Sequence, residues 1–229
     1  KSESRGILIL RLLVALWLIA NFFIVFVPIT GHDTLDYHLP VMRGLVETGA
    51  LNLSATSFTP LPVFGETLYA VPIAMFHEVE APFMFQLLQY IAFVLFLVIV
   101  FAFLRDRVHH PLFSMVGVLG MVSLMDLWRE VLHGGYVDVI GFVYGMVSML
   151  IVVEYAARKE AQPPATLLLS ALFLGFAASI KYTGLIFGAF NGIVLMVLLW
   201  RHRERFRHAL GILMKYALLA AVVAGFWYA

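Results

Sequence analysis

The sequence contains no cysteine and few charged residues, and both absences narrow the class of protein. Without cysteine there is no disulfide framework and no thiolate chemistry. Only 13% of the residues are charged and 62% are hydrophobic, whereas soluble domains are about a quarter charged and about half apolar. Phosphate-binding glycine loops, HExxH and GxSxG are also missing. The chain therefore lacks the sequence signatures of P-loop nucleotidases, zinc proteases and α/β-hydrolases.

What the chain has instead is a series of apolar runs that approach the roughly 20 residues needed to cross a bilayer. We predict an all-α polytopic membrane protein, a single transmembrane domain over residues 1–229. The first run is too long for a signal-peptide core and lacks a small-residue cleavage site, so we expect it to be retained. The predicted spans are residues 7–28, 83–104, 112–127, 136–156, 165–180, 185–200 and 209–228.

The distribution of basic residues predicts the orientation of these spans. Cytoplasmic segments of membrane proteins carry an excess of lysine and arginine. With the N-terminus cytoplasmic, the outer side holds only Arg43, Arg129 and Lys181, and residues 30–80 become an extracytoplasmic loop. The other twelve basic residues fall on the cytoplasmic side: Lys1, Arg5, Arg11, Arg105, Arg107, Arg158, Lys159, Arg201, Arg203, Arg205, Arg207 and Lys215.

The outer loop is predicted to contain two juxtamembrane helices. Residues 36–48 place apolar side chains three and four positions apart, which is typical of an amphipathic helix lying at the membrane interface, and Gly49 fits its C-terminal cap. A second short helix is expected over residues 64–76, interrupted by Pro72. Spacings such as Gly141-xxx-Gly145 and Gly184-xxx-Gly188 predict close helix packing, together with Gly117, Gly120 and Gly175.

The polar segment Gly31–Pro40, GHDTLDYHLP, follows the first span and is the leading candidate for a functional site. It holds two carboxylates, Asp33 and Asp36, beside Tyr37 and His38. An aspartate on the outer surface can serve as a general base while its neighbours orient it. The alternative is that Asp33 or Asp36 caps the amphipathic helix that follows. One of the two can cap while the other does chemistry.

Further candidates lie at the outer ends of the predicted spans. Asp138, in GGYVDVIGF, is either a supporting acid or an interface residue solvated by headgroups. Lys181, in ASIKYTG, is either a ligand for a lipid phosphate or a snorkelling anchor. Arg43 and Arg129 are rival phosphate ligands, and Glu66 is a further candidate for binding substrate.

A metal site is an open alternative on the outer side. His32, His38, His77 and His133 are all predicted there together with the aspartates, and imidazole with carboxylate can bind a divalent ion. No pair of these histidines has the i, i+4 spacing that would make the site specific. We therefore assign no metal ligands and no cofactor. Nothing in the sequence indicates a nucleic-acid partner.

Several motifs, in order along the chain, resemble the GT-C superfamily of membrane glycosyltransferases, in particular its protein-mannosyltransferase-like and aminoarabinose-transferase-like branch. The similarity is carried by a loop acid four residues before a tyrosine in DTLDYHLP and by the proline-containing TPLPVFGETLYAVP. It continues in GYVDVIGF at the head of a span, in LGFAASIKYTGLIF ending at a lysine, and in GFWYA. It covers nearly the whole chain, although each motif is short.

The resemblance implies an inverting glycosyltransferase that moves a sugar from a polyprenyl-phosphate donor to an unidentified acceptor at the outer face of a bacterial plasma membrane. Asp33 would be the base, Asp138 the supporting acid, and Lys181 a structural or phosphate-facing residue. Members of the superfamily usually have more spans, so the alternative is a non-catalytic GT-C-derived subunit of a larger membrane complex. A transporter is a third hypothesis, but its ionisable residues should lie at the midplane, whereas here they lie near span ends.

Overall fold

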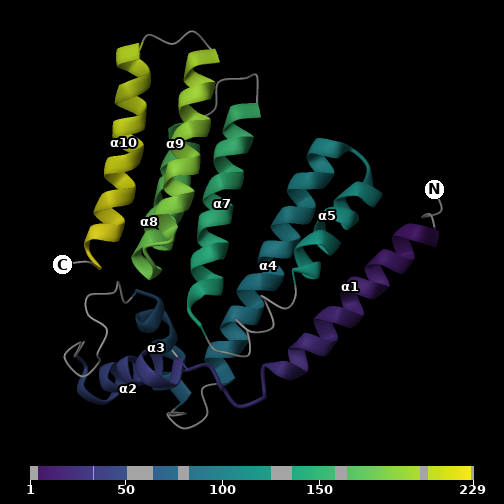
Figure 1. Ribbon diagram of the computed structural model, residues 1–229, viewed down its shortest axis with the longest axis vertical. Helices are drawn as coiled ribbons and strands as arrows, with labels where there is room; N and C mark the ends of the chain where they lie inside the picture. Colours follow the sequence, from purple (N-terminus) through teal and green to yellow (C-terminus); the bar gives the residue numbers. More distant parts are fainter. Residues whose placement is uncertain are drawn as a thin grey trace. The chain divides into compact units, whose positions relative to one another are not determined.

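The computed structural model describes residues 5–32, 34–50, 64–76, 83–124, 136–157, 164–201 and 206–227, and throughout these ranges the regular structure is helical (Figure 1). Three helices are long and apolar enough to cross a membrane: α1 (Arg5–Ile24), α4 (Phe83–Val108) and α7 (Asp138–Ala157). Four further helices contain shorter apolar segments: α5 (Pro111–Ser123), α8 (Pro164–Ile180), α9 (Gly184–Arg201) and α10 (Phe206–Gly225), of which residues 111–123, 165–180, 184–200 and 210–225 are the apolar parts. The predicted all-helical class is confirmed, and seven crossings remain a prediction.

The chain divides into two compact units. Unit 1 comprises Lys1–Ser57 and Thr67–Val139, and unit 2 comprises Phe58–Glu66 and Ile140–Ala229. Each unit is built from helices that pack against neighbours of the same unit. The single transmembrane domain over residues 1–229 stays a prediction.

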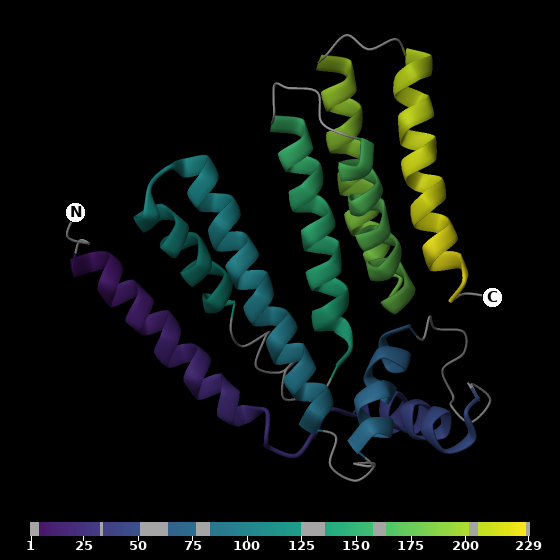
Figure 2. The same cartoon turned by 180° about the vertical axis from the view of Figure 1, so that it is seen from behind.

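In unit 1, α4 and α5 form a helical hairpin against which α1 packs (Figures 1 and 2). The chain turns at His109, which has a φ of 53°, and His110 caps α5 by accepting a hydrogen bond on Nδ1 from the Leu112 N–H at 3.3 Å. A Cβ at Gly117 would lie 2.3 Å from Leu104 Cδ1, so the two helices approach closely at this glycine.

Side chains of α4 hydrogen-bond to the backbone near the end of α1. The Tyr90 hydroxyl donates to the Leu18 carbonyl at 2.8 Å. With its amide nitrogen facing α1, the buried Gln86 donates to the carbonyls of Val25 at 2.6 Å and Val27 at 3.3 Å. Carbonyls that follow the last turn of a helix have no partner within the helix, and Gln86 supplies one.

Between α1 and α4 the described chain forms a π-helical turn, η1 (Thr34–His38), then α2 (Leu39–Thr48) and α3 (Phe64–Phe76). Gly49 ends α2 in the left-handed conformation with a φ of 67°, and its N–H bonds to the Leu45 carbonyl at 2.9 Å, as predicted for a C-cap. The bounds predicted for the second helix are confirmed. The predicted break is wrong, because α3 continues through Pro72.

Unit 2 packs α8, α9 and α10 together and includes most of α7. Helices α8 and α9 form a hairpin in which a Cβ on Gly184 would lie 2.5 Å from the backbone of Ala177. Helix α10 meets α8 at Gly175, where a Cβ would lie 2.6 Å from Val223 Cβ and 2.9 Å from the Ala220 carbonyl oxygen. The predicted close packing is found at these glycines but not at Gly120, where a Cβ would meet nothing within 4 Å.

Candidate functional site

The polar segment after α1 is helical at His32 and again from Thr34 onward. The Leu35 N–H bonds to the Gly31 carbonyl at 3.0 Å, and the π-turn Thr34–His38 runs into α2 without interruption. Short π-helical insertions are uncommon and occur frequently at functional sites. The segment predicted from its composition therefore has an unusual backbone as well as unusual side chains.

Within this segment the Asp36 carboxylate is exposed and bound by a histidine. His32 Nδ1 lies 2.9 Å from Asp36 Oδ2, and the exposed fractions of the two side chains are 84% and 46%. The residues are four apart, the spacing that places side chains on one helix face. Asp36 is thus held by its neighbour while remaining open to molecules outside the protein.

The next two residues are buried, in contrast to Asp36. Tyr37 is 8% exposed and His38 is 2% exposed, and their ring centroids are 3.9 Å apart. Leu39 and Met42 of α2 are buried as well, so the apolar face predicted for this helix packs inward at its start. Tyr37 and His38 therefore anchor the segment, and Asp36 is its outward-facing group.

The capping alternative does not account for Asp36. The N-cap residue of α2 is His38, which has helical φ and ψ angles of −61° and −52° and makes no side-chain capping bond. Asp36 lies inside the preceding π-turn, where its carboxylate pairs with His32. Asp33 lies outside the described residues, so its own capping role stays untested.

The remaining described candidates, apart from Arg43, lie at or next to helix ends. Asp138 is half-buried at the first residue of α7, two residues later than the predicted start, and Glu66 is buried in the first turn of α3. Lys181 is half-buried directly after α8, and its N–H bonds to the Ala177 carbonyl at 3.3 Å. Acids at helix N-termini and cations at C-termini interact favourably with the helix dipole.

The structure brings only some of the predicted site residues together. It brings Asp36 to His32 and Tyr37 to His38, and it places the half-buried Arg43 on α2. Asp36, Tyr37, His38, Arg43 and Asp138 belong to unit 1, and Glu66 and Lys181 to unit 2. Arg129, like Asp33, lies outside the described residues. Across the part of the chain that is described, no three His, Asp or Glu side chains form a group that could hold a metal ion.

A second polar cluster, in unit 2, was not predicted. Ser148 of α7, Ser170 of α8, Asn191 of α9 and Tyr216 of α10 meet between the helices, and the first three are fully buried. Each serine hydroxyl bonds to the other serine's carbonyl, at 2.8 and 2.9 Å. Asn191 Nδ2 donates to Ser148 Oγ at 2.8 Å and to the Tyr216 oxygen at 2.9 Å. Tyr216 lies 2.9 Å from Ser170 Oγ.

The donors and acceptors of this cluster match one another. Both serine hydroxyls are donors to carbonyls, and the amide nitrogen of Asn191 can only donate. The Tyr216 hydroxyl can then donate to Ser170 Oγ at 2.9 Å or to Ser148 Oγ at 3.2 Å. Every donor is used, and the Asn191 Oδ1 acceptor is the one side-chain atom of the cluster with no partner. The Ser148–Ser170–Asn191–Tyr216 cluster therefore fixes four helices against one another.

The sequence contains a weak indication of this cluster. Each of its residues interrupts an otherwise apolar run, and an asparagine inside such a run is costly unless it finds a partner. The sequence does not show which of these residues are partners, because the bonded pairs are 22 to 68 residues apart.

Comparison of the chain with protein-family models, with curated proteins and with solved structures found no match.

Proposed function

We propose that this protein is an inverting glycosyltransferase that moves a sugar from a polyprenyl-phosphate donor to an acceptor at the outer face of a bacterial plasma membrane. One observation carries the proposal: a carboxylate-bearing π-turn follows a helix long enough to span a membrane, and its Asp36 is exposed and held by His32 at 2.9 Å. This exposed acid supports the proposal because it lies three residues after Asp33, the base that the resemblance implies.

In the proposed reaction Asp33 accepts the proton of an acceptor hydroxyl or amine. The freed oxygen or nitrogen attacks the anomeric carbon from the face opposite the phosphate. The bond from that carbon to the phosphate oxygen breaks, and its electrons leave with polyprenyl phosphate. The configuration at the anomeric carbon inverts, and no covalent enzyme intermediate is needed.

The other predicted residues have supporting roles in the proposal. Asp36 and its partner His32 adjust the charge and position of the turn, and Asp138 is the supporting acid. Arg43, Arg129 and Lys181 are rival ligands for the donor phosphate, and the buried Tyr37, His38 and Glu66 hold in place the segments in which they lie. The proposal needs no metal ion.

Purified protein in vesicles with a panel of polyprenyl-phosphate sugars tests the proposal. The wild type should release polyprenyl phosphate from at least one donor. The Asp33→Asn variant should lose about 100-fold or more of this rate, the usual contribution of a general base. Glu47→Gln is the matched control, because Glu47 is an exposed acid on α2 with no role in the reaction.

The control variant should transfer at the wild-type rate. Full activity in the Asp33→Asn variant removes Asp33 as the base. A folded wild-type protein that turns over none of the donors favours the non-catalytic subunit instead.

A further inference from the structure

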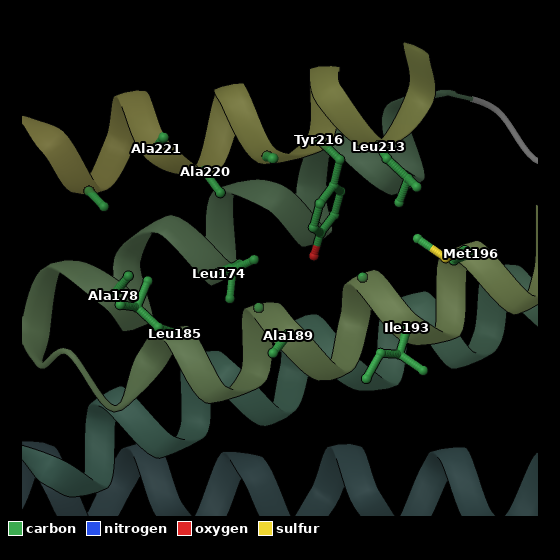
Figure 3. A pocket seen from close by; sticks show the side chains of 14 residues that line it. Leu174, Ala178, Leu185, Ala189, Ile193, Met196, Leu213, Tyr216, Ala220 and Ala221 are labelled. Atoms are coloured by element: carbon green, nitrogen blue, oxygen red, sulfur yellow. The ribbon is translucent and has the colours of Figure 1, made fainter. Parts of the chain in front are cut away.

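Helix α10 has an inward face and an outward face within unit 2. Figure 3 shows Leu213, Tyr216 and Ala220 pointing from α10 toward α8 and α9, and Tyr216 and Ala220 are buried. At 3.6 residues per turn, six residues lie on the opposite side of the helix. This outward face consists of Arg207, Gly211, Met214, Lys215, Leu218 and Val222.

Lys215 is a cation inside the apolar part of α10. That part covers residues 210–225, and Lys215 is its one charged residue. The side chain is exposed, and within the described part of the chain it forms no ion pair. A charged group in the hydrocarbon region of a bilayer is costly unless it pairs with an anion or reaches the headgroups. Lys215 therefore marks the place on α10 where an anion is most favourable.

Arg207 adds a second cation on the same face. It is exposed, and like Lys215 it has no ion-pair partner among the described residues. Arg207, Gly211 and Lys215 follow one another at intervals of four, the spacing that places side chains on one helix face. The two cations start about 12 Å apart along the helix axis. Both side chains are long, and both can close around one phosphate group.

Gly211 leaves the surface between the two cations bare. A Cβ at Gly211 would meet nothing within 4 Å, whereas a Cβ at Gly175 or Gly184 would collide with a neighbouring helix. Close helix packing therefore does not account for this glycine, although glycine inside a helix is less favourable than alanine. What the glycine provides is room for a headgroup against the backbone of α10.

Beyond Lys215 the outward face is apolar. Met214, Leu218 and Val222 are each more than 60% exposed. From Lys215 to the end of α10 at Gly225 the helix rises about 15 Å, which is half of the roughly 30 Å hydrocarbon core of a bilayer. Two cations at one end and an apolar surface over the length of one leaflet match a molecule with an anionic headgroup and an acyl chain.

We propose that the outward face of α10 binds one anionic phospholipid, with its phosphate between Arg207 and Lys215 and an acyl chain along Met214, Leu218 and Val222. A zwitterionic phospholipid fits less well, because its headgroup brings its own cation close to these two. The inference is independent of the proposed transfer reaction, since it uses none of the residues of that reaction and depends only on α10 lying in a bilayer.

The direct test is which lipid stays on the protein after extraction. The full chain is reconstituted into vesicles of equal parts phosphatidylglycerol and phosphatidylcholine, extracted with mild detergent and weighed by native mass spectrometry. One basic residue near a membrane surface favours an anionic lipid about fivefold. With two such residues, bound phosphatidylglycerol should exceed bound phosphatidylcholine about 25-fold.

Removing either cation should lower this ratio. Lys215→Gln and Arg207→Gln should each reduce it to about fivefold, and the double variant should bind the two lipids about equally. Arg105→Gln is the matched control and should leave the ratio unchanged. Arg105 is also an exposed cation near a helix end, but its charge is already offset by Asp106 at 3.6 Å.

A substitution at Gly211 tests the charge without removing a cation. Gly211→Glu places a carboxylate four residues from both Arg207 and Lys215 and should lower the ratio to about fivefold. Gly211→Gln has the same size without the charge and should keep at least half of the enrichment. The open space at the Gly211 Cβ accommodates both side chains.

A second measurement shows that the variants are folded and that binding stabilises the protein. A ligand that binds only the folded state raises the unfolding temperature. Phosphatidylglycerol added to the detergent should therefore raise the Tm of the wild type more than phosphatidylcholine does, and the Arg207→Gln, Lys215→Gln double variant should lose this difference while unfolding at the wild-type temperature without lipid.

Four results would overturn the proposal. One is an unchanged lipid ratio in the Arg207 and Lys215 variants, which would make the enrichment nonspecific. The second is displacement of phosphatidylglycerol by inorganic phosphate, which would indicate an ion site without an acyl-chain contact. The third is displacement by a trace of polyprenyl phosphate, and the fourth is a dimer in which a second copy of the chain covers this face.

Discussion

The two polar regions of this protein differ in charge, in exposure and in the distance along the chain between their members. The His32–Asp36 pair is charged when the histidine is protonated, exposed, and made within one helical turn. The Ser148–Ser170–Asn191–Tyr216 cluster is neutral, buried, and joins four helices. The difference indicates that the two regions have different roles. The exposed pair is free to meet a ligand, whereas the cluster holds the helices in register.

The largest expected effect concerns the close helix approach in unit 2. Replacing Gly184 by alanine places a Cβ 2.5 Å from the Ala177 backbone, which cannot move aside as a flexible side chain can. We expect the free energy of unfolding to fall by about 3 kcal/mol. Thermal unfolding in detergent measures it. Gly192→Ala is the control, and it should instead stabilise by up to about 1 kcal/mol because its Cβ is unopposed.

If Gly184→Ala unfolds like the wild type, the α8–α9 approach is looser than described and the cluster does not depend on it.

The next prediction compares the two polar regions directly. Tyr216→Phe keeps the ring but leaves one N–H of Asn191 without an acceptor in a buried site, which costs about 1–2 kcal/mol. Breaking the exposed pair with His32→Gln should cost less than about 0.5 kcal/mol. Both values come from unfolding of the purified variants under one condition. A larger cost for His32→Gln would reverse the assignment of the two regions.

An instructive variant within the cluster is Asn191→Leu. It removes two hydrogen bonds but also removes Oδ1, the acceptor that has no partner. The three hydroxyls keep an acceptor each, since both serine carbonyls and Ser170 Oγ remain. We expect a change within about 1 kcal/mol, smaller than that of Tyr216→Phe. A loss above that of Tyr216→Phe would mean that Asn191 holds the cluster together.

The smallest effect expected is that of salt. Exposed charges are screened as ionic strength rises, while buried neutral groups are not. The coupling between His32 and Asp36, measured by a double-mutant cycle with His32→Gln and Asp36→Asn, should therefore shrink between 0.05 M and 1 M sodium chloride. The effect of Tyr216→Phe should stay constant over this range, and a parallel change in both would contradict the contrast.

Much of the helical structure could be read from the sequence because apolar runs are bounded by local signals. Gly49 ends α2, and the bounds of α3 were predicted to the residue. The end of α4 was placed too early, at residue 104. The helix continues to Val108, and Arg105 and Arg107 in its last turn suit the helix dipole.

What the sequence could not give was long-range pairing. The Ser148 partners lie on three other helices, and no local periodicity records which spans are neighbours. The candidate site was found because its polar residues are contiguous. Its capping alternative failed for Asp36 because the π-turn Thr34–His38 makes His38 the N-cap of α2, and no residue propensity in the sequence signals a π-turn.

The hydrogen assignment within the buried cluster has a consequence for charge movement through unit 2. Both serine hydroxyls point at carbonyl oxygens, the tyrosine hydroxyl points at a serine, and the amide supplies the remaining hydrogens. A proton-conducting wire requires each hydroxyl to pass its hydrogen to the next and turn around. Here that rotation would break a serine–carbonyl bond, and the spare Asn191 oxygen is a very weak base. Proton transfer along the cluster would therefore have to break a hydrogen bond that holds two helices together.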